Sequence, residues 1–145
     1  MRFFLEISYD GSKYHGWQYQ PNAISIQETI EKALGDLLGV KTPVVGSGRT
    51  DAGVHASCQI AHFDAENIDN EHLKFKLNSY LPREIAIRKI HSVTQKAHAR
   101  FDALSRGYAY HMHLNKNPFK VGTSHYLHAP VALSSIAAAC AILVN

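Results

Sequence analysis

The chain has 145 residues, of which 46% are hydrophobic and 19% are charged, and its formal net charge is +3 at neutral pH. This length and apolar content suffice for a compact folded core and exclude a disordered polypeptide. The two cysteines, Cys58 and Cys140, stand far apart and indicate neither a disulfide framework nor a thiolate metal site, which fits the reducing cytoplasm. No apolar run is long enough to span a bilayer. The small positive charge is compatible with an anionic partner but does not identify one.

The front of the chain predicts a strand followed by a helix. Residues 2–9, RFFLEISY, alternate apolar with polar side chains, which is typical of a half-buried strand. Residues 26–38 place apolar side chains at helical spacing. Ser25 and Glu28 match a capping box, and Gly39 suits the C-terminal cap. We therefore expect a helix between Ser25 and Gly39.

The middle of the chain predicts two strands, a helix and a further strand. The strands 43–48 and 57–63 are joined by a glycine-rich loop, and a helix over 70–81 is stopped by Pro82 before a strand at 84–93. The resulting order β-α-β-β-α-β predicts an α+β fold of the ferredoxin-like type. RNA-recognition modules share this layout, an antiparallel sheet with helices packed on one face, as do many unrelated proteins.

The last part of the chain predicts a strand over 105–114 and a helix that begins near Ser134. We assign residues 1–104 to an N-terminal ferredoxin-like half that carries the glycine-rich loop, and residues 105–145 to the strand and helix that open a second half. The chain stops directly after the apolar run AILV. We therefore expect it to be the front part of a longer protein, with the second half truncated.

The loop GSGRTDAGVHA at 46–56 carries the strongest sign of chemistry. Arg49 stands two residues before Asp51, and its positive charge favours an ionised carboxylate that could act as a nucleophile or stabilise a developing cation. The glycines allow a ligand to approach the backbone closely. The alternative is a surface ion pair in a hairpin loop, which contributes about 0–1 kcal/mol. Neither a GxxxxGK[ST] phosphate loop nor a second carboxylate for magnesium is present nearby, so a nucleotide or magnesium role is not predicted.

A second candidate feature is the segment SRGYAYHMH. If residues 105–113 form a strand, then Arg106, Tyr108 and Tyr110 share one face. An arginine beside aromatic rings would suit a flipped-out or single-stranded nucleotide. An amphipathic strand with its tyrosines partly in the core is the alternative, and without further context it is the favoured one.

Two other features leave alternatives open. Trp17 stands in a loop rich in glycine and aromatic residues, where it could dock a partner or cap the core. Two histidine pairs could each be half of a metal site: His111 with His113, and His125 with His128. No matching carboxylate or cysteine completes either pair, so no metal site is predicted.

Taken together, these segments resemble the tRNA pseudouridine synthase A family. YDGSKYHGWQYQ at 9–20 is similar to the opening motif of the family, and GRTDAGVHA at 48–56 matches its catalytic motif. Shorter motifs follow in the same order: HFD at 62–64, LN at 77–78, LP at 81–82, HARFDA at 98–103 and R-x-Y-x-Y at 106–110. The resemblance covers nearly the whole chain.

This resemblance, which rests most of all on the motif that holds Asp51, implies an isomerase. It would convert uridine to pseudouridine at positions 38–40 of the tRNA anticodon stem-loop. The resemblance also implies Asp51 as the catalytic aspartate, Arg49 as its ion-pair partner and Tyr108 as the ring that stacks on the target base. With Tyr108 we group Arg106 as a substrate-binding residue. No cofactor and no metal are expected, because the reaction involves no net redox change and no energy input.

The resemblance further implies a cytoplasmic protein that acts as a homodimer, without a membrane partner, and a second half beyond Asn145 that completes the active site. This chain alone is then expected to be inactive. Two other interpretations stay open. One is an RNA-binding module without turnover, for which Asp51 would be dispensable. The other is a small α+β assembly domain whose exposed edge pairs with another subunit.

Overall fold

The computed structural model describes residues 1–143, and the chain divides into a first unit, Met1–Arg106, and a second unit that starts at Gly107. The first unit contains four strands and two α-helices, and the second contains two short strands and one α-helix. Arg106 therefore lies in the first unit, two residues beyond the boundary that the sequence predicts at residue 104. The assignment of a catalytic and a truncated half stays a prediction.

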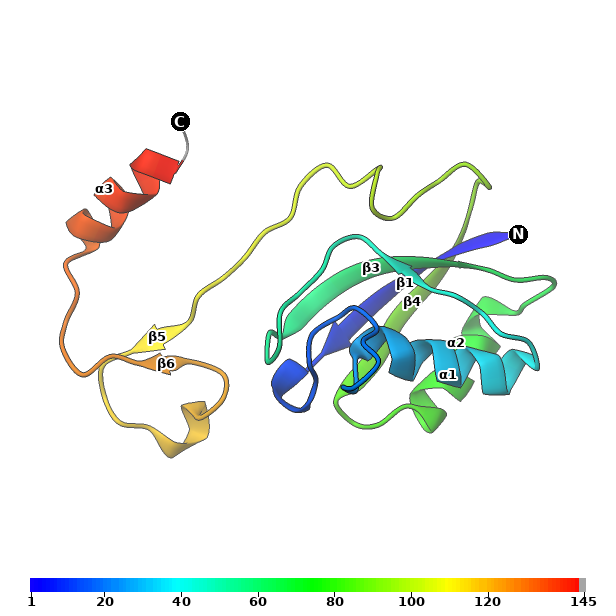
Figure 1. Ribbon diagram of the computed structural model, residues 1–145, viewed down its shortest axis with the longest axis horizontal. Helices are drawn as coiled ribbons and strands as arrows, with labels where there is room; N and C mark the ends of the chain where they lie inside the picture. The colour runs from blue at the N-terminus through cyan, green and yellow to red at the C-terminus, as the bar shows by residue number, and fades with distance from the viewer. Residues whose placement is uncertain (144–145) are drawn as a thin grey trace. The chain divides into compact units, whose positions relative to one another are not determined.

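The first unit is built on one antiparallel sheet (Figure 1). The strands are β1 (Arg2–Tyr9), β2 (Val45–Gly46), β3 (Ala56–Asp64) and β4 (Ile85–Val93), in the spatial order β2-β3-β1-β4. Each neighbouring pair is antiparallel. The α+β prediction is confirmed, and three of these strands agree with the predicted ranges to within one residue at each end. β2 is shorter than the predicted 43–48, since only two of its residues pair with β3.

Two helices lie side by side on one face of this sheet (Figure 1). α1 covers Ile26–Leu38, and the Ser25 side chain accepts a hydrogen bond from the Glu28 N–H at 3.2 Å. Gly39 ends this helix with a φ of 71°, a left-handed conformation that favours glycine. α2 covers Asn70–Tyr80 and is capped by the Asp69 side chain. Both helix predictions are confirmed, and α2 ends one residue early because the residue before a proline prefers an extended backbone.

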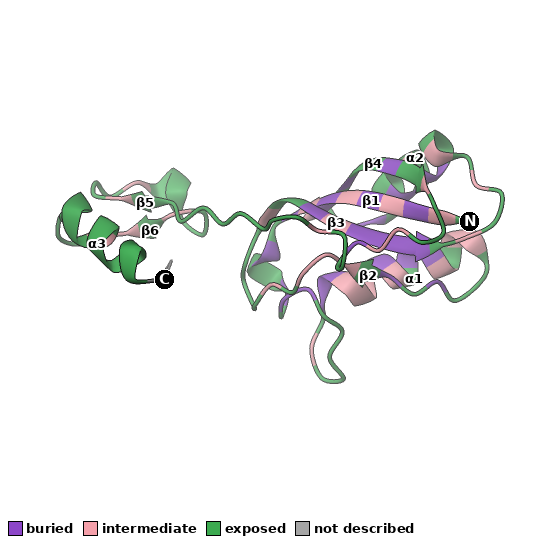
Figure 2. Cartoon of the chain, turned by 90° about the horizontal axis from the view of Figure 1, so that it is seen from above, coloured by how far each residue is buried: buried purple, intermediate pink, exposed green. Residues whose placement is uncertain are grey.

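The core lies between the sheet and these helices (Figure 2). β1 alternates strictly between buried and half-buried residues, so that one face of the strand points into the core. The largest fully buried apolar side chains are Phe3, Phe63, Leu5, Ile7, Ile26, Ile30, Leu34, Leu77 and Val44. Removing a side chain of this size from water contributes roughly 1.5–3 kcal/mol. The first unit therefore has a hydrophobic core of its own.

The second unit has a different character. Its strands β5 (Met112–His113) and β6 (His125–Tyr126) pair in parallel, and α3 covers Leu133–Leu143. A short 3-10 turn, Pro118–Lys120, lies between the two strands in the sequence. None of the residues from 100 to 142 is buried, and Figure 2 shows this region in green and pink.

The predicted strand over 105–114 is wrong for most of its length. Only Met112–His113 is a strand, and residues 104–110 are exposed without strand pairing in the described chain. Alternation in the sequence indicates which backbone could be extended, but a strand also needs a neighbour that accepts its hydrogen bonds. The helix predicted near Ser134 is confirmed and begins at Leu133, while its predicted last two residues, 144–145, lie outside the described residues.

Candidate active site

The glycine loop, residues 46–56, connects β2 to β3 and carries Asp51. Its start is fixed to β3. The Ser47 N–H donates to the Ile60 carbonyl at 2.7 Å, and the amide of the buried Gln59 donates to the Gly48 carbonyl at 2.8 Å. The backbone that leads into Arg49 is therefore held before the loop turns.

A second loop, residues 10–17, supports the centre of the glycine loop. The Trp17 N–H donates to the Thr50 carbonyl at 3.0 Å, and the Gly53 N–H donates to the Tyr14 carbonyl at 3.2 Å. The Thr50 hydroxyl also shares a 2.9 Å hydrogen bond with the Tyr9 hydroxyl. Residues on both sides of Asp51 are thus held by hydrogen bonds, and Asp51 itself is exposed. This arrangement presents a carboxylate to solvent from a backbone that is held in place.

Glycines allow the two loops to approach this closely. Gly16 has a φ of 87°. A Cβ at this position would lie much closer to the Thr50 carbonyl oxygen than van der Waals contact allows. A Cβ on Gly46 would lie 2.5 Å from the ring of Trp17. Gly16 and Gly46 therefore let the two loops pack against each other.

The end of the glycine loop is held at a polar corner. The Gly11 N–H donates to His55 Nδ1 at 3.2 Å, and the same nitrogen lies 3.0 Å from Asp10 Oδ1. Hydrogen bonds from the Ser12 hydroxyl and N–H hold the pKa of Asp10 below its usual range, and His55 adds a smaller effect in the same direction. Asp10 is thereby kept ionised, and it caps the turn Gly11–Lys13 in the loop at 10–17.

A cavity of about 490 Å³ opens beside the glycine loop, and we call it the arginine hollow. Three guanidinium side chains line it, and its lining includes no carboxylate. The remaining lining residues are polar amides, apolar side chains and the start of the loop. The full set is Trp17, Gln18, Gln27, Val44, Val45, Gly46, Ser47, Gly48, Arg49, Arg100 and Arg106.

The structure does not join Arg49 and Asp51 as an ion pair. Both residues are exposed, and neither belongs to any ion pair in the part of the chain that the structure describes. Arg49 lines the hollow, whereas Asp51 is not among its lining residues. The catalytic roles of both residues stay predictions, and the structure supplies the setting in which they would act.

Arg106 contacts the glycine loop. Its Nε and Nη2 donate to the Ser47 carbonyl at 2.9 and 2.6 Å, and Nη2 also donates to the Arg100 carbonyl at 3.0 Å. Its side chain packs over Gly48, where an added Cβ would lie 3.1 Å from Nε. Arg106 thus ties the segment after β4 to the start of the loop, next to Arg49. Its contact with substrate stays a prediction.

Tyr108, the predicted stacking residue, lies in the second unit and is 74% exposed. It belongs to no strand, so the shared strand face that placed Arg106, Tyr108 and Tyr110 together is not formed. A ring this exposed has most of its surface available for stacking. The assignment of Tyr108 to the target base stays a prediction.

Sequence reasoning missed Arg100 as a candidate site residue. It stands in the HARFDA segment, which folds back to the hollow from the end of β4. The motif HARFDA at 98–103 was the signal in the sequence, but only the fold shows that these residues reach the glycine loop. Trp17, for which two readings were open, is 3% exposed and lies 6.2 Å from the Tyr9 ring, so it packs in the core and lines the hollow.

Among residues 1–143, no group of three or more His, Cys, Asp or Glu side chains is arranged to hold a metal ion. Within the same residues, no helix combines the length and the apolar character needed to cross a membrane.

Comparison with known proteins connects the chain to one family. The sequence model of a family described as tRNA pseudouridine synthase matches residues 7–102, which include the glycine loop, the loop at 10–17 and Arg100. Three curated relatives illustrate the similarity, and each bears the name tRNA pseudouridine synthase A. The protein of Bacteroides fragilis is 48% identical over 132 residues, which are 90% of this chain and 52% of the relative. That of Parabacteroides distasonis is 44% identical, over 99% of this chain and 58% of the relative.

The similarity extends beyond these two organisms. The protein of Geobacter sp. is 41% identical over 97% of this chain and 58% of its own length. The chain spans about half the length of the curated relatives it matches. A family match over most of the first unit and identities above 40% over nearly the whole chain lead to one conclusion: the chain belongs to the tRNA pseudouridine synthase family.

Proposed function

We propose that the protein containing this chain isomerises uridine to pseudouridine in tRNA and that Asp51 is the catalytic carboxylate. One observation carries the proposal. Asp51 is exposed on a loop whose neighbouring residues, Thr50 and Gly53, are hydrogen-bonded to a second loop. A reacting group held by a fixed backbone loses little freedom when it meets a substrate, which is a major source of catalytic rate.

The reaction requires one carboxylate and no electron carrier. The glycosidic bond from C1′ to N1 breaks, the base turns, a bond from C1′ to C5 forms, and the proton on C5 is replaced by one on N1. Asp51 can attack C1′, add to the base, or remove the 2′ proton so that a glycal forms. Each route uses the carboxylate of Asp51, which is exposed on the loop.

The target nucleotide has to leave its stack before any of these steps. Extrusion of a base costs a few kcal/mol, which contacts to the protein must offset. We assign Arg49 and Arg106 to the RNA strand near the target and Tyr108 to stacking on the base, since guanidinium groups bind phosphates and aromatic rings stack on bases. The proposed targets are the uridines at positions 38–40 of the anticodon stem-loop. This choice rests on the resemblance of the motif that holds Arg49 and Asp51.

The organisation of the whole protein is also part of the proposal. The strand order β2-β3-β1-β4 and the order of elements support a ferredoxin-like fold, related to RNA-recognition modules, for the first unit. Residues 1–104 would form the catalytic half, and residues 105–145 would open a second half. We further propose a cytoplasmic homodimer in which that second half completes the active site. The 145-residue chain would then be inactive alone.

The test is pseudouridine formation in an unmodified tRNA transcript. It compares the intact natural protein, its Asp51→Asn variant and the 145-residue chain. We expect turnover by the intact protein and a loss of at least about a thousandfold in Asp51→Asn, since a group that forms or breaks bonds cannot be replaced by its amide. Asp36→Asn, which alters an exposed carboxylate on α1, is the matched control and should keep full activity.

Other outcomes would favour the competing interpretations. If the intact protein and Asp51→Asn bind tRNA equally and neither makes pseudouridine, an RNA-binding module is the better description. Self-association without measurable tRNA affinity would indicate an assembly domain. Full activity in the Asp51→Asn variant would refute the catalytic role of Asp51 directly.

A further inference from the structure

Three guanidinium groups converge on the arginine hollow without a counter-ion. Among the described residues, Arg49, Arg100 and Arg106 belong to no ion pair. The partners of Arg106 are two backbone carbonyls, which accept its hydrogen bonds but do not neutralise its charge. Like charges gathered around one cavity repel each other, and an anion placed between them removes that repulsion.

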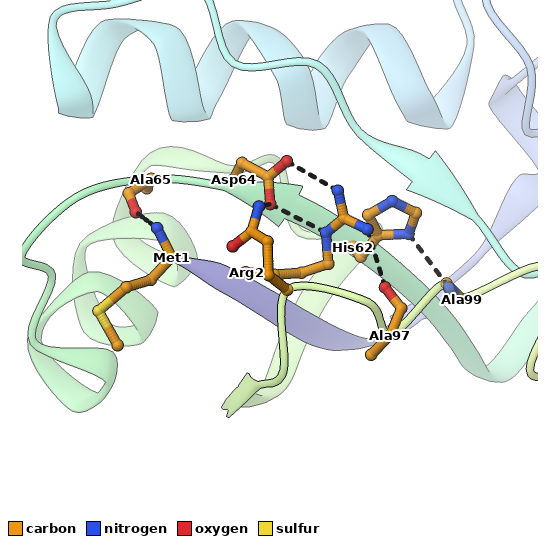
Figure 3. Close-up of polar contacts among 8 residues, drawn as sticks. Met1, Arg2, His62, Asp64, Ala65, Ala97 and Ala99 are labelled. Carbon is orange, nitrogen blue, oxygen red and sulfur yellow. Dashed lines mark hydrogen bonds and ion pairs between the residues drawn. The ribbon is translucent and has the colours of Figure 1, made fainter.

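The position of Arg100 is set by contacts that precede it in the sequence. Figure 3 shows the side chain of Arg2 between Asp64 and the backbone of residue 97. Arg2 Nε and Nη2 each donate to one oxygen of Asp64 at 2.9 Å, and Nη1 donates to the Ala97 carbonyl at 2.9 Å. Because Nε and Nη2 are both held by Asp64, the guanidinium plane is fixed and Nη1 is directed at the Ala97 carbonyl.

A second contact holds the residue directly before Arg100. The Ala99 N–H donates to His62 Nδ1 at 3.2 Å, and both residues are buried (Figure 3). Burial lowers the pKa of His62, and the nearby charges of Arg2 and His98 lower it further. His62 is thus neutral and can accept this hydrogen bond. The backbone at residue 100 then continues to the hollow, where its carbonyl accepts from Arg106.

We propose that the arginine hollow binds one backbone phosphate of the RNA substrate, with Arg100 as a phosphate-binding residue beside Arg49. The identity of the anion as RNA rests on the proposed function. A guanidinium presents paired donors that match two oxygens of a phosphodiester. A cavity of about 490 Å³ admits a nucleotide backbone together with its sugar.

The experiment measures the salt dependence of tRNA binding by the intact protein. Replacing a residue that neutralises one phosphate lowers the slope of log Kd against log salt by about one and weakens binding. We expect Arg100→Gln to show this change, with a loss of affinity on the order of fivefold near physiological salt. Arg100→Lys should keep the slope, because it keeps the charge. In pseudouridine formation, KM should rise more than kcat falls.

Arg88→Gln is the matched control, since it removes an exposed arginine on β4 that does not line the hollow. An unchanged slope in Arg100→Gln would overturn the inference. An equal drop in both variants would also overturn it, because the effect would then be one of total charge. The backbone contacts of residue 100 do not depend on its side chain, so Arg100→Gln should fold.

The two proposals can fail separately. If the intact protein makes no pseudouridine but Arg100→Gln alone lowers the salt slope, the phosphate site stands and the synthase function falls. If the intact protein is active and the slope does not change, the function stands and the phosphate site is refuted.

Discussion

The two segments that meet at the arginine hollow are held in different ways. The glycine loop is fixed mostly by its backbone, through hydrogen bonds of Ser47, Thr50 and Gly53 with β3 and with the loop at 10–17. The segment 97–106 is fixed by side chains of other elements that bind its backbone, and by its own Arg106. The loop therefore depends on the absence of side chains at Gly46 and at Gly16 of the loop at 10–17. The segment depends on a few side chains, of which His62 can also be protonated.

The largest effect is expected from a side chain added between the two loops. Gly16→Ala places a Cβ against the Thr50 carbonyl and forces a non-glycine residue to a φ of 87°. We expect the free energy of unfolding of this chain to fall by roughly 2–4 kcal/mol, measured by urea denaturation. Gly39→Ala is the control, because Gly39 also has a positive φ of 71° but nothing within 4 Å of the added atom. Its cost should stay near 1 kcal/mol.

If Gly16→Ala and Gly39→Ala cost the same, backbone conformation alone explains both, and the close packing of the loops is not the source of stability. Close contact between the loops at 10–17 and 46–56 would then not distinguish the glycine loop from the segment 97–106.

A smaller, pH-dependent effect is expected at the segment. The pKa of His62 is lowered from 6.5 in the folded protein, so the unfolded chain binds more protons as the pH falls through that value. The stabilisation by neutral His62 is therefore complete above about pH 6.5 and is lost as the pH falls toward the folded-state pKa. Arg2, Asp64 and His98 are the charged and titratable groups that face it.

His62→Gln tests this, because glutamine does not titrate in this range. At pH 7.5 we expect the variant to be less stable by about 1–2 kcal/mol, since it disturbs a buried hydrogen bond to the Ala99 N–H. At pH 5.5 the gap between the two proteins should narrow, as measured by urea denaturation at both pH values. An identical gap at both would mean that His62 does not titrate differently on folding.

The smallest expected effect concerns the side-chain contact at the start of the loop. Gln59→Met keeps much of the side-chain shape but removes the donor to the Gly48 carbonyl, and should cost about 1 kcal/mol in unfolding free energy. The control Gln95→Met alters an exposed glutamine whose contact to Asp64 is 3.5 Å long, and it should be neutral within about 0.5 kcal/mol. A neutral Gln59→Met would mean that the loop is held by its backbone alone.

Much of the first unit could be predicted from the sequence because its signals are local. The alternation in residues 2–9 and the helical spacing after Ser25 gave the observed elements, since each periodicity reflects burial against one side of the core. The predicted strand over 105–114 failed because pairing is a property of two segments, and the sequence of one does not reveal whether the other is there.

The candidate site was predictable in its residue types but not in its contacts. The motif identified Asp51 and Arg49, but the ion pair that the resemblance implies for them is not formed among the described residues. The contact of Arg106 with Ser47 joins residues 59 positions apart, and the contact of Ala99 with His62 joins residues 37 apart. Such pairings depend on the fold as a whole, and no local pattern encodes them.

The place of Trp17 has a practical consequence. It is the only tryptophan in the chain, and its ring is buried against Gly46 in the lining of the hollow. Excitation of tryptophan therefore reads out this one location, without signal from any other indole in the sequence. A change in its emission when an oligonucleotide is added would report events at the hollow itself, and a shift to longer wavelength on heating would report the separation of the two loops.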